Sequence, residues 1–326
     1  MTKGADFSSV RFRSDCQWSL GGIVMTAILW AWSGEGTLAA RFAQAKKIGR
    51  RALGAKHVPD SSYQAFTKLL RTWTVRLLAG LARVFRTRMT TVFANRLRLG
   101  KFVPFGVDGS RFGLPRTQSN EAHFSPSAKK RKGPHQKKRG RSKQSAILRA
   151  KKADTPQMWV TTLWHLGIGL PWSWRLGPSN SSERSQLLDM LGELEGLRAL
   201  LVADAGFFGY EFWSAIRLAG QHFVIRVGSH VRLLKKLGYA KERNGLVYCW
   251  PDRAAMKSQP PLVLRLIVIH NGKHPVYLVT SVLDQKELSE RDVAKAYSLR
   301  WGIEVYYRHV KQTLEVIVHG PEVDCR

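Results

Sequence analysis

The segment Leu197-Arg-Ala-Leu-Leu-Val-Ala-Asp-Ala-Gly-Phe-Phe-Gly209 indicates the fold class most directly. Its apolar run ends at an acid, Asp204, and a glycine follows two residues later. A short apolar run bounded by turn residues is typical of a buried strand. The same pattern occurs in Phe102-Val-Pro-Phe-Gly-Val-Asp-Gly-Ser110, where Asp108 ends the run. Strands of this kind, alternating with helical segments, predict an α/β fold.

Asp108 and Asp204 are expected where central strands end, and open α/β sheets bind ligands outside those carboxyl ends. Each acid taken alone is more often ordinary turn chemistry, because Asp and Gly are common turn residues. Joined by a third carboxylate, the two would supply the hard oxygen ligands that Mg²⁺ prefers. Two such ions, about 3.5–4 Å apart, can activate an attacking oxygen and stabilise a leaving oxygen at a phosphodiester.

A third carboxylate is expected on a helix in the segment Tyr297-Ser-Leu-Arg-Trp-Gly-Ile-Glu304, which runs on to Lys311. A helix advances about 100° per residue, so Tyr297, Glu304 and Lys311 would lie within about 20° of one line, with Arg300 about 60° aside. A carboxylate among three phosphate-binding groups suits a site where a metal meets a nucleic-acid backbone. The alternative is a solvated, salt-bridged helix face.

The composition predicts a polyanionic partner. The chain has 53 Lys and Arg against 23 Asp and Glu, a formal charge of +30 on 326 residues. This excess is far beyond what solubility requires and favours a nucleic-acid binder. A hydrophobic content of 44% with 11 Trp predicts large buried cores. The 3 cysteines lie far apart, so they imply neither a disulfide framework nor a zinc site, which fits a reducing cytoplasm.

Two regions concentrate the positive charge. Residues 1–100, with 17 Lys and Arg against 4 Asp and Glu, are predicted to form a helical DNA-binding region. Its uncharged run over residues 16–34 contains polar residues, so we expect a buried helix rather than a signal or membrane span. Residues 129–152 hold 12 basic residues and no acid, which predicts a loop that orders on phosphates. The DNA-binding candidates in this loop are Lys129, Lys130, Arg131, Lys137, Lys138 and Arg139.

The other segments predict alternating strands and helices. Residues 157–164 and 167–174 are expected to form a hairpin, and a helix is expected to begin at Asn180, with Glu183 completing a capping box. A helix over residues 210–219 and strands over residues 223–227, 247–250, 262–270 and 275–283 should follow. One helix, beginning near Leu288, is expected to carry Glu304.

Three ordered blocks resemble the DDE transposases of the insertion-sequence-four family, which includes the transposon-five enzyme. The spacing of Tyr297, Arg300, Glu304 and Lys311 resembles the family signature, while residues 107–110 and 203–210 resemble its first and second Asp regions. The resemblance covers roughly residues 106–314. It implies an RNase H-like catalytic core, placed at residues 101–227 and 274–326, with a mostly β insertion domain at 228–273.

The resemblance also implies roles for single residues. Asp108, Asp204 and Glu304 would be the catalytic triad that binds Mg²⁺, with Mn²⁺ as a substitute, and Tyr297, Arg300 and Lys311 would hold DNA phosphates. The family also stacks an extruded base on an aromatic side chain, for which Trp250 and Trp213 are candidates, with core packing as the alternative role of each.

The implied activity is transposition: the enzyme binds the terminal inverted repeats of its element, nicks a strand by hydrolysis and joins the free 3′-OH to target DNA. The implied partners are these double-stranded DNAs and a second copy of the chain in a synaptic homodimer, without a membrane, in a bacterial cytoplasm at the nucleoid. After Leu314 the sequence departs from the family and stops at Arg326, so it is expected to be truncated. Two alternatives stay open, an RNase H-like nuclease without strand transfer and a catalytically inactive DNA-binding remnant.

Overall fold

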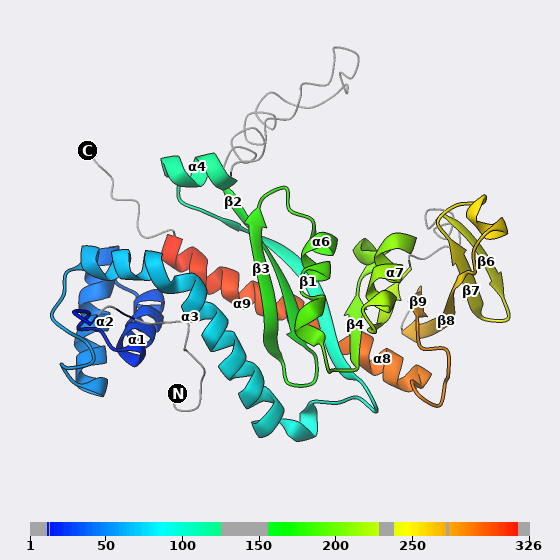
Figure 1. The fold of residues 1–326 in the computed structure, drawn as a ribbon, viewed down its shortest axis with the longest axis horizontal. Coiled ribbons are helices and arrows are strands. Elements are labelled where there is room, and N and C mark those ends of the chain that lie inside the picture. The colour runs from blue at the N-terminus through cyan, green and yellow to red at the C-terminus, as the bar shows by residue number, and fades with distance from the viewer. Residues whose placement is uncertain (1–11, 13, 125–155, 228–237, 272–273, 319–326) are drawn as a thin grey trace, which may run out of the picture. The chain divides into compact units, whose positions relative to one another are not determined.

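The computed structural model describes residues 12, 14–124, 156–227, 238–271 and 274–318, and Figure 1 shows the chain as a ribbon. The chain divides into two compact units, one of residues 1–92 with 308–326 and one of residues 93–307. The predicted basic loop at residues 129–152, with its six candidate DNA-binding residues, lies outside the described residues. Among the described helices, none is both long and apolar enough to span a membrane.

The first unit is helical, as predicted for the N-terminal part of the chain. Side chains cap two of its helices, because Ser19 Oγ accepts a hydrogen bond from the Gly22 N–H and Thr37 Oγ1 accepts one from the Ala40 N–H. The helices of this region are α1 (Leu20–Trp32), α2 (Leu38–Leu53) and α3 (Tyr63–Val92).

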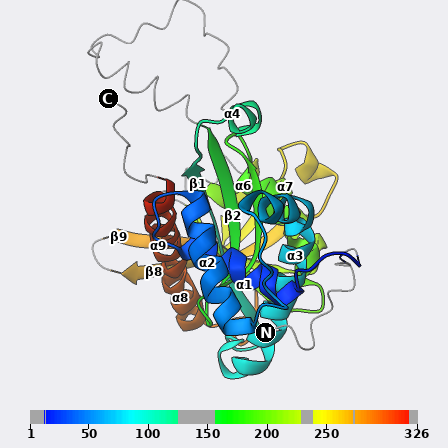
Figure 2. The same cartoon turned by 90° about the vertical axis from the view of Figure 1, so that its left-hand side faces the viewer.

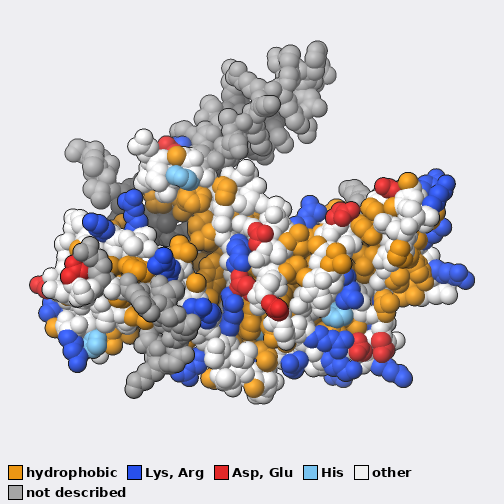
Figure 3. All heavy atoms as spheres, viewed as in Figure 1, with side chains coloured by type: hydrophobic (Ala, Val, Ile, Leu, Met, Phe, Trp, Pro, Cys, Tyr) orange, Lys and Arg blue, Asp and Glu red, His pale blue; other side chains and the backbone are white. Residues whose placement is uncertain are grey.

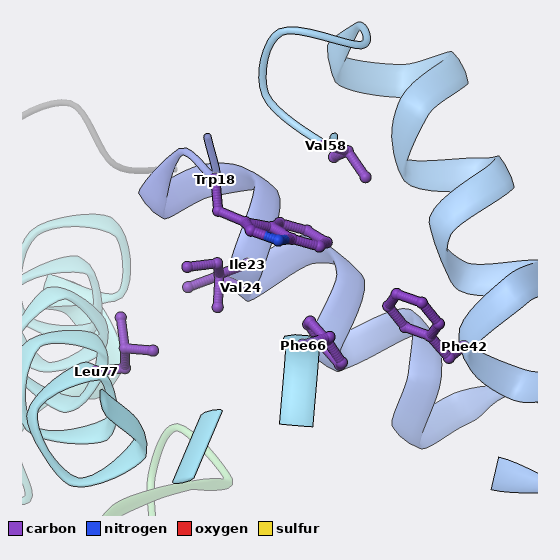
Figure 4. Close-up of a cluster of buried hydrophobic side chains, with 7 residues drawn as sticks. All are labelled: Trp18, Ile23, Val24, Phe42, Val58, Phe66 and Leu77. Atoms are coloured by element: carbon purple, nitrogen blue, oxygen red, sulfur yellow. The ribbon is translucent and has the colours of Figure 1, made fainter. Parts of the chain in front are cut away.

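Apolar side chains from these three helices and their connections form one core (Figure 4). Phe66 of α3 is fully buried at its centre, where its ring stacks on Phe42 of α2 at 4.8 Å between centroids. Because α1 approaches the backbone of His57 closely, a Cβ at Gly22 would lie 1.9 Å from the His57 carbonyl oxygen. The core residues are Trp18, Ile23, Val24, Phe42, Val58, Phe66 and Leu77.

A mixed nine-stranded sheet, in the order β3-β2-β1-β4-β5-β9-β8-β7-β6, forms the centre of the second unit. The pairs β1–β4 and β4–β5 are parallel, and all other neighbouring pairs are antiparallel. The predicted α/β class is therefore confirmed. The strands are β1 (Val103–Gly113), β2 (Gln157–His165), β3 (Leu170–Pro178), β4 (Ala199–Ala203), β5 (His222–Arg226), β6 (Tyr239–Arg243), β7 (Leu246–Trp250), β8 (Leu262–Asn271) and β9 (His274–Thr280).

Helices cover both faces of this sheet. Figures 1 and 2 show α6 and α7 on one face, with α8 and the start of α9 on the other. Every residue of β4 is buried, as expected for a strand covered on both sides. The α-helices of this unit are α4 (Gln118–Phe124), α6 (Glu183–Leu188), α7 (Tyr210–Leu218) and α8 (Glu290–Leu299), with α9 (Trp301–Val318) running out of it; short 3₁₀ helices are η1 (Ala94–Arg96), η2 (Leu191–Leu194), η3 (Ala205–Phe207) and η5 (Ala255–Lys257).

Several predicted boundaries are wrong, and three of them concern the segments that carry Glu183, Glu304 and Asp108. The helix expected from Asn180 begins at Glu183, because the Ser182 side chain caps it, so Glu183 occupies its first turn instead of completing a capping box. The helix expected from Leu288 is two helices, α8 and α9, which meet at Arg300. The strand expected to end at Asp108 continues to Gly113, because its antiparallel pairing with β2 persists after its pairing with β4 has stopped.

His165, at the end of β2, makes the stability of the fold depend on pH. Its side chain is fully buried, Nδ1 accepts a hydrogen bond from the Ile168 N–H, and Nε2 donates to the Leu97 carbonyl, both at 3.1 Å. Burial lowers the pKa of His165 from 6.5 to about 4. Between these pH values the unfolded chain binds a proton that the folded chain does not, so acidification favours unfolding.

We therefore expect the free energy of unfolding to fall as the pH drops from about 6.5 to about 4, with up to about 3 kcal/mol of the loss due to His165. The measurement is chemical denaturation at several pH values, for the unaltered chain and for His165→Asn. The variant should show a shallower pH dependence, and equal slopes would contradict the prediction.

Candidate active site

The sheet brings Asp108 and Asp204 to the same edge. β1 and β4 are paired in parallel from Val103–Ala199 to Gly106–Val202. β4 ends at Ala203, so Asp204 follows the strand directly, while β1 continues through Asp108 paired only with β2. Because the parallel pairing stops just before both acids, Asp204 leaves the sheet beside the point where Asp108 loses β4 as a neighbour, as expected for a site at the carboxyl ends of strands.

Backbone groups hold one oxygen of each Asp side chain. Asp108 Oδ1 accepts a hydrogen bond from the Gly109 N–H at 2.9 Å, and Asp204 Oδ1 accepts one from the Gly206 N–H at 2.8 Å. Burial raises the pKa of Asp108 to about 6, and the charges of Asp204 and Glu304 act in the same direction. The carboxylates of Asp204 and Glu304 therefore lie near enough to Asp108 to disfavour its charged form.

Glu304 lies in the first turn of α9 and is paired with a cation of the predicted signature. Arg300 Nη2 lies 2.7 Å from Glu304 Oε1, and the Arg300 guanidinium lies 5.5 Å from the centre of the Tyr297 ring. Tyr297, Arg300 and Glu304 are thus neighbours, although the helix break at Arg300 separates Tyr297 from Glu304. Lys311 lies seven residues beyond Glu304 on α9, in the part of that helix assigned to the first unit.

The donor set fits a divalent cation in its chemistry. Asp108, Asp204 and Glu304 each have one carboxylate oxygen to which no described residue donates a hydrogen bond. A cation would relieve the repulsion that contributes to the raised pKa of Asp108. As the described side chains stand, however, no three His, Cys, Asp or Glu residues lie close enough together to hold one ion. If the three acids converged on an ion, that ion would compete with Arg300 for the Glu304 carboxylate.

Tyr307 fastens the helix that carries Glu304 to the strand that carries Asp108. The backbone carbonyl oxygens of Asp108 and Val160 lie 2.8 and 3.0 Å from the Tyr307 hydroxyl, which donates to them. The side chain is 5% exposed, and burial raises the pKa of Tyr307, so the hydroxyl keeps its proton. No sequence pattern singled out this residue, because its hydrogen bonds link positions 199 and 147 residues apart.

Tyr307→Phe removes this attachment with little change in volume. We expect the free energy of unfolding to fall by about 0.5–1.5 kcal/mol, because the variant loses the hydrogen bonds from the buried hydroxyl to two strand carbonyl groups. Urea denaturation measures the loss. The matched control is Tyr248→Phe, since no described residue forms a hydrogen bond with the Tyr248 hydroxyl. A loss equal to that of the control would show that the attachment is unimportant.

Glu183 is a fourth acid near this site, although its sequence context indicates only a helix-capping residue. Burial raises the pKa of Glu183 to about 7, and the charges of Asp108 and Asp204 act in the same direction. No sequence pattern linked Glu183 to this site, because its neighbour Gly109 lies on a strand that is distant in the sequence. A Cβ at Gly109 would lie 2.6 Å from Glu183 Cγ, so a side chain there would displace the acid.

The two tryptophans proposed for base stacking are both structural. Trp213 is fully buried against Phe223, and Trp250 is 8% exposed with its indole N–H donating to the Gln259 carbonyl. Trp301, in contrast to these two buried tryptophans, is 55% exposed. It lines a cavity of about 990 Å³, together with Tyr297, Arg300, Ile269, His270, Val276, Ser289, Arg291, Asp292, Ala294, Lys295 and Ser298.

The family description "Transposase DDE domain" matches residues 105–317, more than half of the sequence. This chain belongs to that transposase DDE domain family. The resemblance inferred from the three sequence blocks is thereby confirmed at the level of the family. The matched segment contains Asp108, Asp204 and Glu304.

Two known proteins are similar to this DDE transposase domain protein. The transposase InsG for insertion sequence element IS4 of Escherichia coli (strain K12) is 29% identical over 147 residues, 43% of this chain and 32% of that protein. The chain thus spans about a third of that relative. The cryo-EM structure of the piggyBac transposase synaptic complex with hairpin DNA matches 93% of this chain and 62% of that chain, with 11% identity and a TM-score of 0.41.

Proposed function

We propose that this chain is a divalent-metal-dependent DDE transposase, which binds the ends of its element, nicks DNA by hydrolysis and joins the 3′-OH to target DNA. One observation carries the proposal. In the segment that matches the DDE family, Asp108 and Asp204 lie where the parallel pairing of β1 and β4 ends, and the charges of Asp204 and of Glu304 on α9 add to the rise in the pKa of Asp108. Three carboxylates beside an arginine suit the ionic requirements of a phosphodiester reaction.

Asp108, Asp204 and Glu304 are the residues proposed to hold Mg²⁺ or Mn²⁺. When bound, such ions activate the attacking oxygen and stabilise the leaving oxygen of an in-line displacement. Arg300 is proposed to exchange its ion pair with Glu304 for a DNA phosphate, because a guanidinium binds either group in the same bidentate geometry. The hydrogen bond from Tyr307 to the Asp108 carbonyl links α9, which carries Glu304, to β1, which carries Asp108.

DNA binding is proposed to extend beyond the carboxylates. Tyr297, Arg300 and Lys311 are the proposed phosphate contacts at the element end, with the basic residues of the 129–152 segment as further contacts. The cavity lined by Tyr297, Arg300 and Trp301 has cationic and aromatic walls, which suit a phosphate and a stacked base. Figure 3 shows Lys and Arg side chains distributed over many parts of the visible surface, consistent with a polyanionic partner.

The remaining architecture of the proposal follows from family membership. We infer an RNase H-like catalytic core with a β-rich insertion and an N-terminal DNA-binding region. A homodimeric synaptic complex at the bacterial nucleoid is the proposed working form. The strands β6, β7 and β8 lie within the proposed insertion at residues 228–273 and are joined to the other strands of the sheet through β9.

The test uses the full chain with duplexes that carry the terminal repeats of its element and a supercoiled target plasmid. Nicking at the repeat and joined products, both dependent on Mg²⁺ or Mn²⁺, are the expected results. Nicking without joining would favour the nuclease alternative. Specific binding without any nicking, in a folded chain, would favour the inactive DNA-binding alternative.

A further inference from the structure

We propose that one exposed face of α3 enters the major groove of duplex DNA and reads the sequence of the element end. The inference rests on the proposed function, to which it adds the surface that selects the DNA. Six exposed side chains, which recur at helical spacing within an arc of about 100°, define this outer face of α3. They are Gln64, Lys68, Arg71, Thr72, Val75 and Ala79.

The opposite side of α3 anchors the outer face to a packed core. Phe66 and Leu77, about 20° apart around the helix, are buried in the core of the first unit (Figure 4). Where the helix begins, Ser62 Oγ accepts a hydrogen bond from the Ala65 N–H at 3.2 Å, and the Ser62 carbonyl accepts one from the Phe66 N–H at 3.1 Å. Because packing and capping fix the helix, the outer face presents its side chains in a defined geometry, as a recognition surface requires.

The outer face carries positive charge that no acid of the helix balances. α3 has six Lys and Arg and no Asp or Glu among its 30 residues. Lys68 and Arg71 are three residues apart, a spacing at which like charges destabilise a helix. Among the described residues, none forms a hydrogen bond or an ion pair with either side chain. Lys46 of α2, by contrast, lies 2.6 Å from Asp60. A solvated helix face usually mixes both signs of charge, so this face fits a polyanion better.

The outer face also suits the major groove in size and chemistry. A helix about 10–12 Å across fits a groove about 12 Å wide. In that groove Arg and Lys donate to guanine, Gln pairs with adenine, and small apolar groups contact the thymine methyl. Three members of the outer face are donors of these kinds, and the other three end in methyl groups. None is aromatic, so the helix backbone can approach the base edges closely.

Two other occupants fit the outer face less well. A second copy of α3 would bring Lys68 and Arg71 against the cations of another helix without acids, and like charges that face each other oppose association. A membrane surface would require several large apolar side chains beside the cations. Val75, which is 81% exposed, is the largest apolar member of the outer face. Duplex DNA is therefore the partner that the charge and the side chains favour.

The test uses the full chain, a duplex with the terminal repeat of its element and a scrambled duplex of the same length. Fluorescence anisotropy measures both affinities. Val75→Glu, which places an acid in the outer face, should weaken binding to the repeat about a hundredfold or more, because the new charge faces DNA. Thr91→Glu is the matched control, because Thr91 is an exposed β-branched residue about 160° around α3 from Val75. This control should bind the repeat like the unaltered chain.

Arg71→Gln tests whether the outer face reads bases. The variant should lower the affinity for the repeat about 5–150-fold, the effect of one bidentate base contact, and the affinity for the scrambled duplex much less. In the unaltered complex, guanine N7 atoms of the repeat should be protected from dimethyl sulfate, because N7 lies in the major groove. Arg71→Gln should lose part of this protection. Equal losses of affinity on both duplexes would identify a phosphate contact and overturn the inference.

The outcomes separate this inference from the proposed function. If Val75→Glu and Arg71→Gln discriminate the repeat like the unaltered chain and metal-dependent nicking persists, the outer face has no part in recognition and the proposed function stands. If the unaltered chain does not distinguish the repeat from the scrambled duplex, both are overturned. If Val75→Glu changes only the oligomeric state in light scattering, the face packs against a second copy and the inference fails. Both variants should melt like the unaltered chain, because both positions are exposed.

Discussion

Replacing Asp204 by Asn is expected to reduce metal-dependent nicking by about a thousandfold or more, the scale seen when an essential group is removed from an active site. Asn keeps the size of the side chain and an oxygen that can accept the Gly206 hydrogen bond. It lacks the negative charge that a divalent ion requires of its ligand. Binding to the element end should persist, because Lys and Arg side chains, and not the Asp204 carboxylate, are expected to contact the DNA phosphates.

The measurement is the initial rate of nicking of a labelled end duplex in Mg²⁺, with binding followed by a gel-shift titration. Glu304→Gln should behave in the same way. The matched control is Asp189→Asn, which removes an exposed carboxylate at the end of α6 and should leave the rate unchanged. Substantial nicking by Asp204→Asn would remove Asp204 from the catalytic triad.

The positions of the two Asp residues were predictable because their cause is local. An apolar run that ends in an acid and a glycine defines a buried strand and its exit, and both runs became parallel neighbours in the sheet. For β1, the pairing with β4 ends at Gly106, whereas the strand itself ends at Gly113 because its pairing with β2 continues. Which partner remains after Gly106 depends on residues far away in the sequence, so no local pattern predicts it.

The third acid was predictable from its spacing, but its surroundings were not. The assumption of one continuous helix placed Tyr297 and Glu304 on one line, whereas the chain breaks its helix at Arg300. Tyr297 and Glu304 both remain near Arg300, because the backbone there keeps helical angles of −55° and −31°. Periodicity therefore identified the neighbours correctly and their geometry only approximately.

Glu183 shows the limit of local analysis more sharply. In sequence it resembles a capping residue, and it does lie in the first turn of a helix. Its nearness to Asp108 and Asp204 arises from the packing of α6 over Gly109 and Gly177, glycines on two different strands. Such a contact depends on the assembled sheet, and a single sequence gives no means of linking position 183 to position 109.

Trp213→Ala is expected to lower the free energy of unfolding by about 3–5 kcal/mol, the usual cost of removing a large aromatic side chain from a core. Trp213 is fully buried, its ring stacks on Phe223 at 5.5 Å, and its indole N–H donates to the Phe207 carbonyl at 3.0 Å. That carbonyl belongs to η3, the turn that Asp204 caps. The variant should therefore also loosen the backbone that holds Asp204.

Trp301→Ala provides the contrasting measurement, because the same chemical change is made on a side chain that is 55% exposed. Its unfolding free energy should stay within about 0.5 kcal/mol of the unaltered chain. Its binding to an element end with an unpaired base should weaken by about 1–3 kcal/mol, the usual contribution of one stacked base. Denaturation and binding titrations on both variants decide between the two roles. If Trp213→Ala is stable and loses DNA binding while Trp301→Ala keeps it, then the stacking residue is Trp213, and its buried position opens when DNA binds.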